Sequence, residues 1–129
     1  MAAAASTDSN YAQQYALPGT FSAAASFPLL RAAVDSAESH GYRYTVGNVL
    51  SSDVFYRDTP VMDQWTKMGI LAAEMESFAL YCNAARAGVQ ALGIFSVSDS
   101  IVTGDEKSAQ ERQTSFTNMM RVALETACG

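Results

Sequence analysis

A mostly apolar run from Val89 to Val97, closed by Ser98 and Asp99, most constrains what this chain can fold into. The run does not alternate apolar and polar residues, which is typical of a strand that is covered on both faces. Such strands belong to α/β proteins, where helices cover both faces of a largely parallel sheet. The run therefore predicts a buried strand within a layered α/β domain.

Helix and strand patterns alternate along the rest of the chain. Helical spacing of apolar residues predicts helices at 28–39, 61–68, 76–87 and 108–127. Strand patterns at 42–50 and 70–73 lie between them, and 7–25 and 51–60 are predicted loops. The alanine run at 2–5 is interpreted as part of a strand or as a tail. The last helix has a capping-box pattern at its start and a predicted apolar face of Phe116, Met119, Met120, Ala123, Leu124 and Ala127.

Composition excludes several classes of function. The length of 129 residues predicts one domain or part of one, and the apolar fraction of 49% is sufficient for a hydrophobic core. The net charge of -5 and the scattered basic residues disfavour nucleic acid as a partner. One histidine and two distant cysteines give little material for a metal site, and the cysteines are expected to be reduced. No signal peptide and no membrane-spanning run is recognised, which predicts a cytoplasmic protein.

Asp99 and Arg112 form the first candidate pair. Asp99 stands at the carboxyl end of the predicted strand, where open α/β sheets bind ligands, although a turn or capping aspartate is the alternative. Arg112 lies in the first turn of the last predicted helix, where the helix dipole disfavours a cation by about 0.3–1 kcal/mol. A carboxylate or an anionic ligand nearby would offset this, and an exposed arginine is the alternative. Together an Asp–Arg pair can position a proton and stabilise the resulting charge.

Two further candidates point to a sugar and a base. Glu74 and Glu76 are two residues apart on an extended segment, so both carboxylates face one side and suit adjacent sugar hydroxyls. Their alternative is a role as acids at the start of a helix. Phe55 lies in an apolar patch within a polar loop and could stack on a planar base, or it could pack in the core.

These residues carry a resemblance to a known family. The segments Val46–Tyr56, Glu74–Glu76, Ser96–Asp99 and Glu111–Phe116 resemble the bacterial hexameric purine nucleoside phosphorylases, the high-molecular-mass branch of the nucleoside phosphorylase superfamily. The resemblance covers the chain from about Ala5 to Ala127. Glu-Met-Glu is shared across the superfamily, whereas Ser-Asp followed by Glu-Arg-Gln-Thr is specific to this branch. Ser77 departs from it, because many members carry alanine there.

The resemblance implies a nucleoside phosphorylase/hydrolase-like three-layer α/β fold with a largely parallel mixed sheet. It also implies a pentosyltransferase of purine salvage, which cleaves a purine nucleoside with phosphate to give the free base and ribose 1-phosphate. Inorganic phosphate is the co-substrate, and no cofactor or metal is expected. The intact family is cytoplasmic and forms a homo-oligomer, a hexamer arranged as a trimer of dimers, without nucleic-acid or membrane partners.

Residue roles follow from the resemblance in the same way. Asp99 matches the acid that protonates the purine at N7, and Arg112 matches the residue that assists this transfer. Met75 and Glu76 match the residues that hold the ribose hydroxyls, with Glu74 beside them. Phe55 matches the ring that packs on the base, and Ser98 lies next to the base. Hydroxyl anchors and a protonated leaving group suit an oxocarbenium-like transition state, so Asp99 must carry a proton in the substrate complex.

The resemblance places the phosphate-binding loop, arginines and serine in a part of the family's chain that precedes the match to Ala5. We therefore expect residues 1–129 to be a single partial nucleoside phosphorylase domain, the C-terminal portion of an incomplete fold, and inactive alone. Uridine phosphorylase, methylthioadenosine/adenosylhomocysteine nucleosidase and a non-catalytic purine-binding remnant are the alternatives. The Glu-Met-Glu-Ser string at 74–77 also occurs in uridine phosphorylases.

Overall fold

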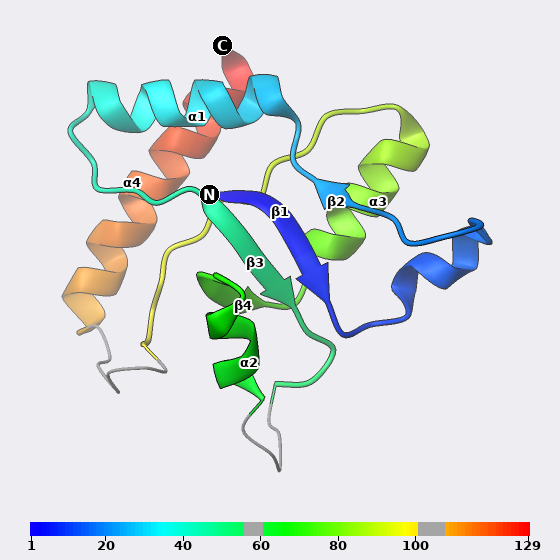
Figure 1. Cartoon of the computed structure of the whole chain (residues 1–129). Coiled ribbons are helices and arrows are strands. Elements are labelled where there is room, and N and C mark those ends of the chain that lie inside the picture. Colours follow the sequence, from blue (N-terminus) through cyan, green and yellow to red (C-terminus); the bar gives the residue numbers. More distant parts are fainter. Residues whose placement is uncertain (56–60, 101–107) are drawn as a thin grey trace.

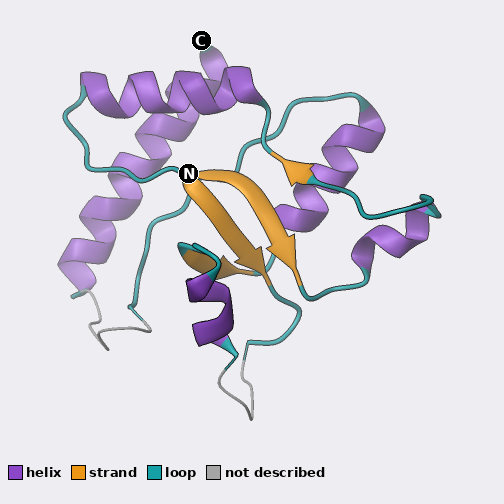
Figure 2. Cartoon of the chain, in the orientation of Figure 1, coloured by secondary structure: helices purple, strands orange, loops and turns teal. Residues whose placement is uncertain are grey.

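The computed structural model describes residues 1–55, 61–100 and 108–129, without the side chain of Arg112. The strands are β1 (Ala2–Thr7), β2 (Ala23–Ala24), β3 (Gly47–Ser51) and β4 (Ala72–Glu74). The helices are α1 (Phe27–Ser39), α2 (Met62–Lys67), α3 (Ser77–Ala87), α4 (Ala109–Cys128) and the short 3-10 helix η1 (Tyr11–Tyr15). From β2 to α3, strands and helices alternate along the described chain as the sequence predicts, and α4 then follows α3 (Figures 1 and 2).

The sheet is mixed and open, with strand order β2-β1-β3-β4. β1 pairs parallel with β3, β3 pairs parallel with β4, and only the β1–β2 pair is antiparallel. The prediction of an α/β fold with a largely parallel mixed sheet is confirmed. The alanine run at 2–5 is part of β1, and its small side chains let α3 approach the sheet closely: Ala2 is 0% and Ala5 6% exposed.

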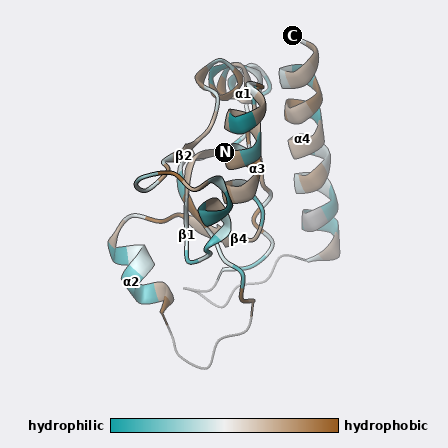
Figure 3. Cartoon of the chain, turned by 90° about the vertical axis from the view of Figure 1, so that its right-hand side faces the viewer, coloured by the Kyte–Doolittle hydropathy of each residue, from teal (hydrophilic) through white to brown (hydrophobic). Residues whose placement is uncertain are grey.

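Two apolar clusters hold the helices in place. The first joins α3 to β1, β2 and β3 through Phe78, Tyr81, Cys82 and the strand side chains. The second lies between α1 and α4 and contains Ala33, Ala37 and Val122. Figure 3 shows α4 as a separate column beside α3, and Figure 1 shows that it crosses α1 near its C-terminal end. The sheet and α3 thus form one packed unit, to which the α1–α4 pair is attached.

Local signals place the helix ends as predicted. Gly88 ends α3 in the left-handed conformation with φ 68°, which L side chains rarely adopt. The capping box at the start of α4 is present: the Glu111 N–H donates to Ser108 Oγ at 3.3 Å, and the Ser108 N–H donates to Glu111 Oε2 at 2.9 Å. No helix in the described part of the chain is long and apolar enough to cross a membrane.

The predicted strand over 89–97 is wrong within the described structure. Only Gly93 pairs there, by an isolated antiparallel bridge to Ala2. Two backbone N–H groups of the segment donate to side-chain hydroxyls and not to the backbone of a neighbouring strand. Ser26 Oγ accepts from the Ala91 N–H at 2.9 Å, and Tyr81 Oη accepts from the Gly93 N–H at 2.9 Å. The segment is therefore extended along the sheet without joining it as a strand.

Two other expectations about local structure are corrected. The predicted loop at 7–25 contains η1 and β2, and the strand predicted at 42–50 begins only at residue 47. The predicted apolar face of α4 is also wrong, because Phe116, Met120 and Leu124 are 40%, 51% and 65% exposed. Val122 and Thr126 are the buried residues of α4, since the other face of the helix meets α1.

Candidate functional site

The parallel pairing of β3 and β4 brings two predicted segments of the site together. Ser51, the last residue of β3, is the register partner of Glu74, the last residue of β4. The Ser52 N–H extends the pairing by donating to the Glu74 carbonyl at 2.8 Å. Because parallel strands end at one edge of a sheet, the chain after β3 and the chain after β4 leave from the same place. This edge is where the sequence predicted a ligand site.

Glu74 itself is engaged with the start of α3. Its Oε2 accepts hydrogen bonds from the N–H groups of Glu76 and Ser77, each at 2.8 Å. Its Oε1 accepts a hydrogen bond from the Ser51 hydroxyl, which in turn accepts from the Phe78 N–H at 2.8 Å. The helix-terminus alternative considered for the acidic pair is therefore the geometry that Glu74 adopts.

Met75 and Glu76 occupy the turn between β4 and α3. Met75 is 44% exposed, and Glu76 is exposed as well. The Met75 N–H donates to Glu76 Oε2 at 3.2 Å. The Glu76 side chain makes no capping hydrogen bond to α3, unlike the carboxylate of Glu74. The two residues thus present an apolar side chain and a carboxylate at the sheet edge.

Phe55 lies on the loop after β3 and is 75% exposed, so the core-packing alternative for this ring is wrong. The loop is tied to the chain after β1: Ser52 Oγ donates to Asp8 Oδ2 at 3.0 Å, and the Asp53 N–H donates to Asp8 Oδ1 at 3.2 Å. A third hydrogen bond, from the Val54 N–H to Ser52 Oγ at 3.2 Å, closes a tight turn just before Phe55.

Asp8 and Ser52 are residues of this edge that reasoning from the sequence missed. Asp8 directly follows β1, just as Asp99 follows the apolar run at 89–97. Asp99 is selected because a polar residue at the carboxyl end of a strand can bind a ligand. The same criterion selects Asp8 once the alanine run is assigned as a strand.

Ser98 and Asp99 form the second part of the candidate site. The Ser98 hydroxyl donates to Asp99 Oδ2 at 2.8 Å, and Asp99 is exposed. This part is tied to α4, because Ser96 Oγ donates to the Ser115 carbonyl at 3.0 Å. The backbone of Arg112 lies in the first turn of α4, while its side chain lies outside the described residues. Ser96, three residues before Asp99, is thereby fixed to the second turn of α4.

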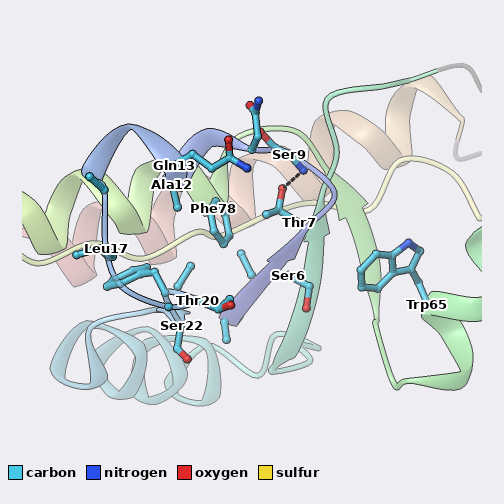
Figure 4. Close-up of a pocket in the computed structure, with 17 residues that line it drawn as sticks. Ser6, Thr7, Ser9, Ala12, Gln13, Leu17, Thr20, Ser22, Trp65 and Phe78 are labelled. Carbon is cyan, nitrogen blue, oxygen red and sulfur yellow. Dashed lines mark hydrogen bonds between the residues drawn. The ribbon is translucent and has the colours of Figure 1, made fainter.

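The positions of two hollows in the surface bear on the candidate site. The larger, of about 760 Å³, lies between β1, η1 and the chain before β2 (Figure 4). Its described lining includes Ser6, Thr7, Gln13, Thr20 and Phe78, has no charged residue and contains none of the predicted site residues. The described lining therefore offers no charged group for acid–base chemistry.

The smaller hollow, of about 480 Å³, lies along the first turns of α4 from Gln110 to Asn118. Glu111 and Ser115 are in its lining, so this hollow lies on the helix that carries Arg112 and that receives the bond from Ser96. Among the described residues, no group of three or more potential metal ligands occurs.

Comparisons with known proteins agree on one family. Residues 3–129 match the model of the Phosphorylase superfamily. A purine nucleoside phosphorylase, DeoD-type, from Geobacillus sp. (strain WCH70) is 46% identical over 127 residues, which are 98% of this chain and 54% of the relative. The DeoD-type relative from Clostridium perfringens (strain SM101 / Type A) is 51% identical over 108 residues, 83% of this chain and 46% of the relative. This chain thus spans about half the length of the curated relatives it matches.

The fold has a counterpart among solved structures. The crystal structure of purine nucleoside phosphorylase from Toxoplasma gondii in complex with immucillin-H matches with a TM-score of 0.84. The match covers 97% of this chain and 52% of that chain, at 21% sequence identity. At this identity the likeness establishes the α/β fold alone.

Proposed function

Because this chain belongs to the phosphorylase superfamily, we propose that it supplies the base and sugar side of a site for the phosphorolysis of purine nucleosides. The observation that carries the proposal is the identity of 46–51% to DeoD-type purine nucleoside phosphorylases over most of the chain. The pairing of Ser51 with Glu74 supports it, because it puts the Phe55 loop and the Met75–Glu76 turn at one edge.

The sugar is held at the turn between β4 and α3. A carboxylate offers several acceptor positions, so the exposed Glu76 can accept hydrogen bonds from two adjacent sugar hydroxyls. Binding replaces the hydrogen bond that the Glu76 carboxylate now accepts from the Met75 N–H at 3.2 Å. The Met75 side chain covers an apolar face of the sugar, and Glu74 stays behind the turn.

The base lies against Phe55 and beside Ser98. The exposed ring of Phe55 offers a flat surface to a planar purine. Asp99 gives a proton to N7, so the departing base leaves without the negative charge that it would otherwise carry. The Ser98 hydroxyl orients the Asp99 carboxyl group through its 2.8 Å hydrogen bond, and Arg112 assists the transfer from the first turn of α4.

The proposal extends to the whole protein only through its relatives. It includes inorganic phosphate as co-substrate without a cofactor, a homo-oligomer, and a cytoplasmic location. For the 129 residues themselves, the proposal is that they bind a purine nucleoside through the residues named above.

Binding measurements test the proposal without requiring turnover. Inosine should bind more tightly than 7-deazainosine, which lacks N7, by about tenfold, since a charge-assisted hydrogen bond contributes about 1.5–3 kcal/mol. Asp99→Ala should remove this preference, whereas Asp63→Asn, an exposed acid in the first turn of α2, should retain it. Equal binding of inosine and 7-deazainosine by the wild-type chain would contradict the proposed role of Asp99.

A second experiment separates the alternatives. The purified chain is incubated with inosine, with and without phosphate, and hypoxanthine is measured. Release that does not depend on phosphate would indicate a nucleosidase, and binding of uridine in preference to inosine would indicate a uridine phosphorylase. Phosphate-dependent release at about 1 s⁻¹ or faster, within the usual range for enzymes, would contradict the expectation that the 129 residues alone are inactive.

A further inference from the structure

The turn of residues 75–76 is held by two side chains that lie outside it, Ser51 and Glu74. Three backbone N–H groups at the start of α3 donate to them, those of Glu76, Ser77 and Phe78. Glu74 Oε2 accepts the first two at 2.8 Å each, and Ser51 Oγ accepts the third at 2.8 Å. The first N–H groups of a helix have no acceptor within the helix, so these bonds satisfy donors that would otherwise be unpaired.

The two side chains also bind each other. The Ser51 hydroxyl donates to Glu74 Oε1, and the two residues are register partners at the ends of β3 and β4. Ser51 is 4% exposed, so its hydroxyl is both donor and acceptor in a place that water barely reaches. The residue at the N-cap position of α3, Glu76, makes no side-chain capping bond. Ser51 and Glu74 together therefore cap the N-terminus of α3.

Glu74 has little capacity left for a ligand. Its carboxylate accepts three hydrogen bonds, from the Ser51 hydroxyl and from two backbone N–H groups. An ionised carboxylate has about four acceptor positions, so most of them are in use. Glu76 is the neighbouring carboxylate whose side chain is exposed at the sheet edge. Of the two acids, Glu76 is the one suited to bind the sugar directly.

We propose that Ser51 and Glu74 are positioning residues, which fix the backbone on both sides of Glu76 so that its carboxylate and the Met75 side chain face the sugar. This inference rests on the proposed function. It assigns Ser51 a role that reasoning from the sequence did not suggest, and it moves Glu74 from the sugar to the support of the turn. A displacement of about 1 Å at a positioned group can change a rate or an affinity by about 100-fold, so the effect is measurable.

Ser51→Ala is the principal variant, and Ser77→Ala is its matched control. Ser51→Ala leaves the Phe78 N–H and one oxygen of Glu74 without their partner. Ser77→Ala removes a hydroxyl from the same helix turn, but that hydroxyl is buried and has no hydrogen-bond partner among the described residues, and the Ser77 backbone N–H is retained. Both variants remove a buried serine hydroxyl close to the turn, but only Ser51→Ala removes one that holds the turn.

Isothermal titration with inosine and with hypoxanthine gives the first measurement. Ser51→Ala and Glu74→Ala should each weaken inosine binding by about tenfold or more, while hypoxanthine, which has no sugar, binds as before within about twofold. The double variant should be no weaker than the worse single variant, because both residues act through one turn. Ser77→Ala should match the wild-type chain for both ligands.

Amide hydrogen exchange gives a measurement that needs no ligand. Exchange should accelerate about tenfold or more at Phe78 in Ser51→Ala, and at Glu76 and Ser77 in Glu74→Ala. Unchanged exchange in these variants, or unchanged inosine binding, would overturn the inference while the proposed function stands. A wild-type chain that binds neither inosine nor hypoxanthine would instead overturn the proposed function, and with it the sugar part of the inference.

Discussion

Tyr81 joins α3 to the start of β1 through a single oxygen atom, and replacing it with phenylalanine tests how the fold is held together. The hydroxyl donates to the Ala2 carbonyl at 2.6 Å and accepts from the Gly93 N–H at 2.9 Å. Tyr81 is 2% exposed and Ala2 is fully buried, so water does not readily replace these bonds. Tyr81→Phe keeps the ring in the core and removes only this bridge.

The expected loss of stability follows from the two groups left unpaired. A buried donor or acceptor without its partner costs about 1–3 kcal/mol, so for two such groups the free energy of unfolding should fall by about 2–6 kcal/mol. This is a large share of the roughly 5–15 kcal/mol that stabilises a domain of ordinary size. With a slope of about 2 kcal/mol per molar urea, the unfolding midpoint should move down by about 1–3 M.

Urea unfolding followed by circular dichroism measures this change, with Tyr15→Phe as the matched control. The Tyr15 hydroxyl also makes a hydrogen bond, to Asn83 Oδ1 at 2.6 Å, but on the exposed surface, so its loss should change stability by about 0.5 kcal/mol or less. If Tyr81→Phe and Tyr15→Phe lower the urea midpoint equally, the hydrogen bonds of Tyr81 to Ala2 and Gly93 do not add to the free energy of unfolding.

The pH dependence provides a second check on Tyr81. Burial raises the pKa of Tyr81 above its ordinary value of 10.0, against a smaller opposing effect of the hydrogen bond from Gly93. Because the folded pKa is the higher one, the corresponding stability is present below the unfolded pKa and is lost as the pH rises through the folded pKa. The wild-type chain should therefore lose more stability than Tyr81→Phe above about pH 10. A parallel decline of both would contradict this assignment.

Two further predictions concern α4. Val122→Ala should lower the free energy of unfolding by about 1.5–3 kcal/mol, because Val122 is 4% exposed. Leu124→Ala, at a site 65% exposed, should change it by about 0.5 kcal/mol or less. If urea unfolding gives the reverse order, the buried face of α4 is the one predicted from the sequence. Hydrogen bonds from Ser36 and then His40 hold the pKa of Glu125 below its ordinary value of 4.5. Its stabilising effect is thus present above the unfolded pKa and is lost as the pH falls through the folded pKa. The difference in urea midpoint between wild type and Glu125→Gln should therefore shrink as the pH falls below about 4.5, and a constant difference would contradict the pairing.

Much of the secondary structure could be predicted because its signals are local. The left-handed glycine after α3 and the capping box before α4 act within a few residues, and both are present as predicted. The segment at 89–97 could not be predicted in this way. Whether it becomes a strand depends on Ser26 and Tyr81, whose hydroxyls come from distant parts of the chain and occupy its backbone groups.

The candidate site likewise has features that the sequence could indicate and features that depend on distant residues. The sequence indicated candidate residues, and of these Phe55, Met75 and Glu76 lie exposed at the edge of the sheet. It could not separate the roles of Glu74 and Glu76, because two acids two residues apart have the same local pattern. The side chain of Arg112 is outside the described residues, so its part in the site stays a prediction.

By itself, the sequence determined the α/β class, the helices α1 to α4 with their ends, and the candidates Phe55, Met75 and Glu76 that lie exposed after β3 and β4. Periodicity and capping depend on neighbours along the chain, so they are legible without a structure. The tertiary structure decided which face of α4 is buried, which extended segments join the sheet and which glutamate is engaged with α3. Those outcomes depend on partners far away in sequence: α1 for α4, Tyr81 for Gly93, and Ser51 for Glu74.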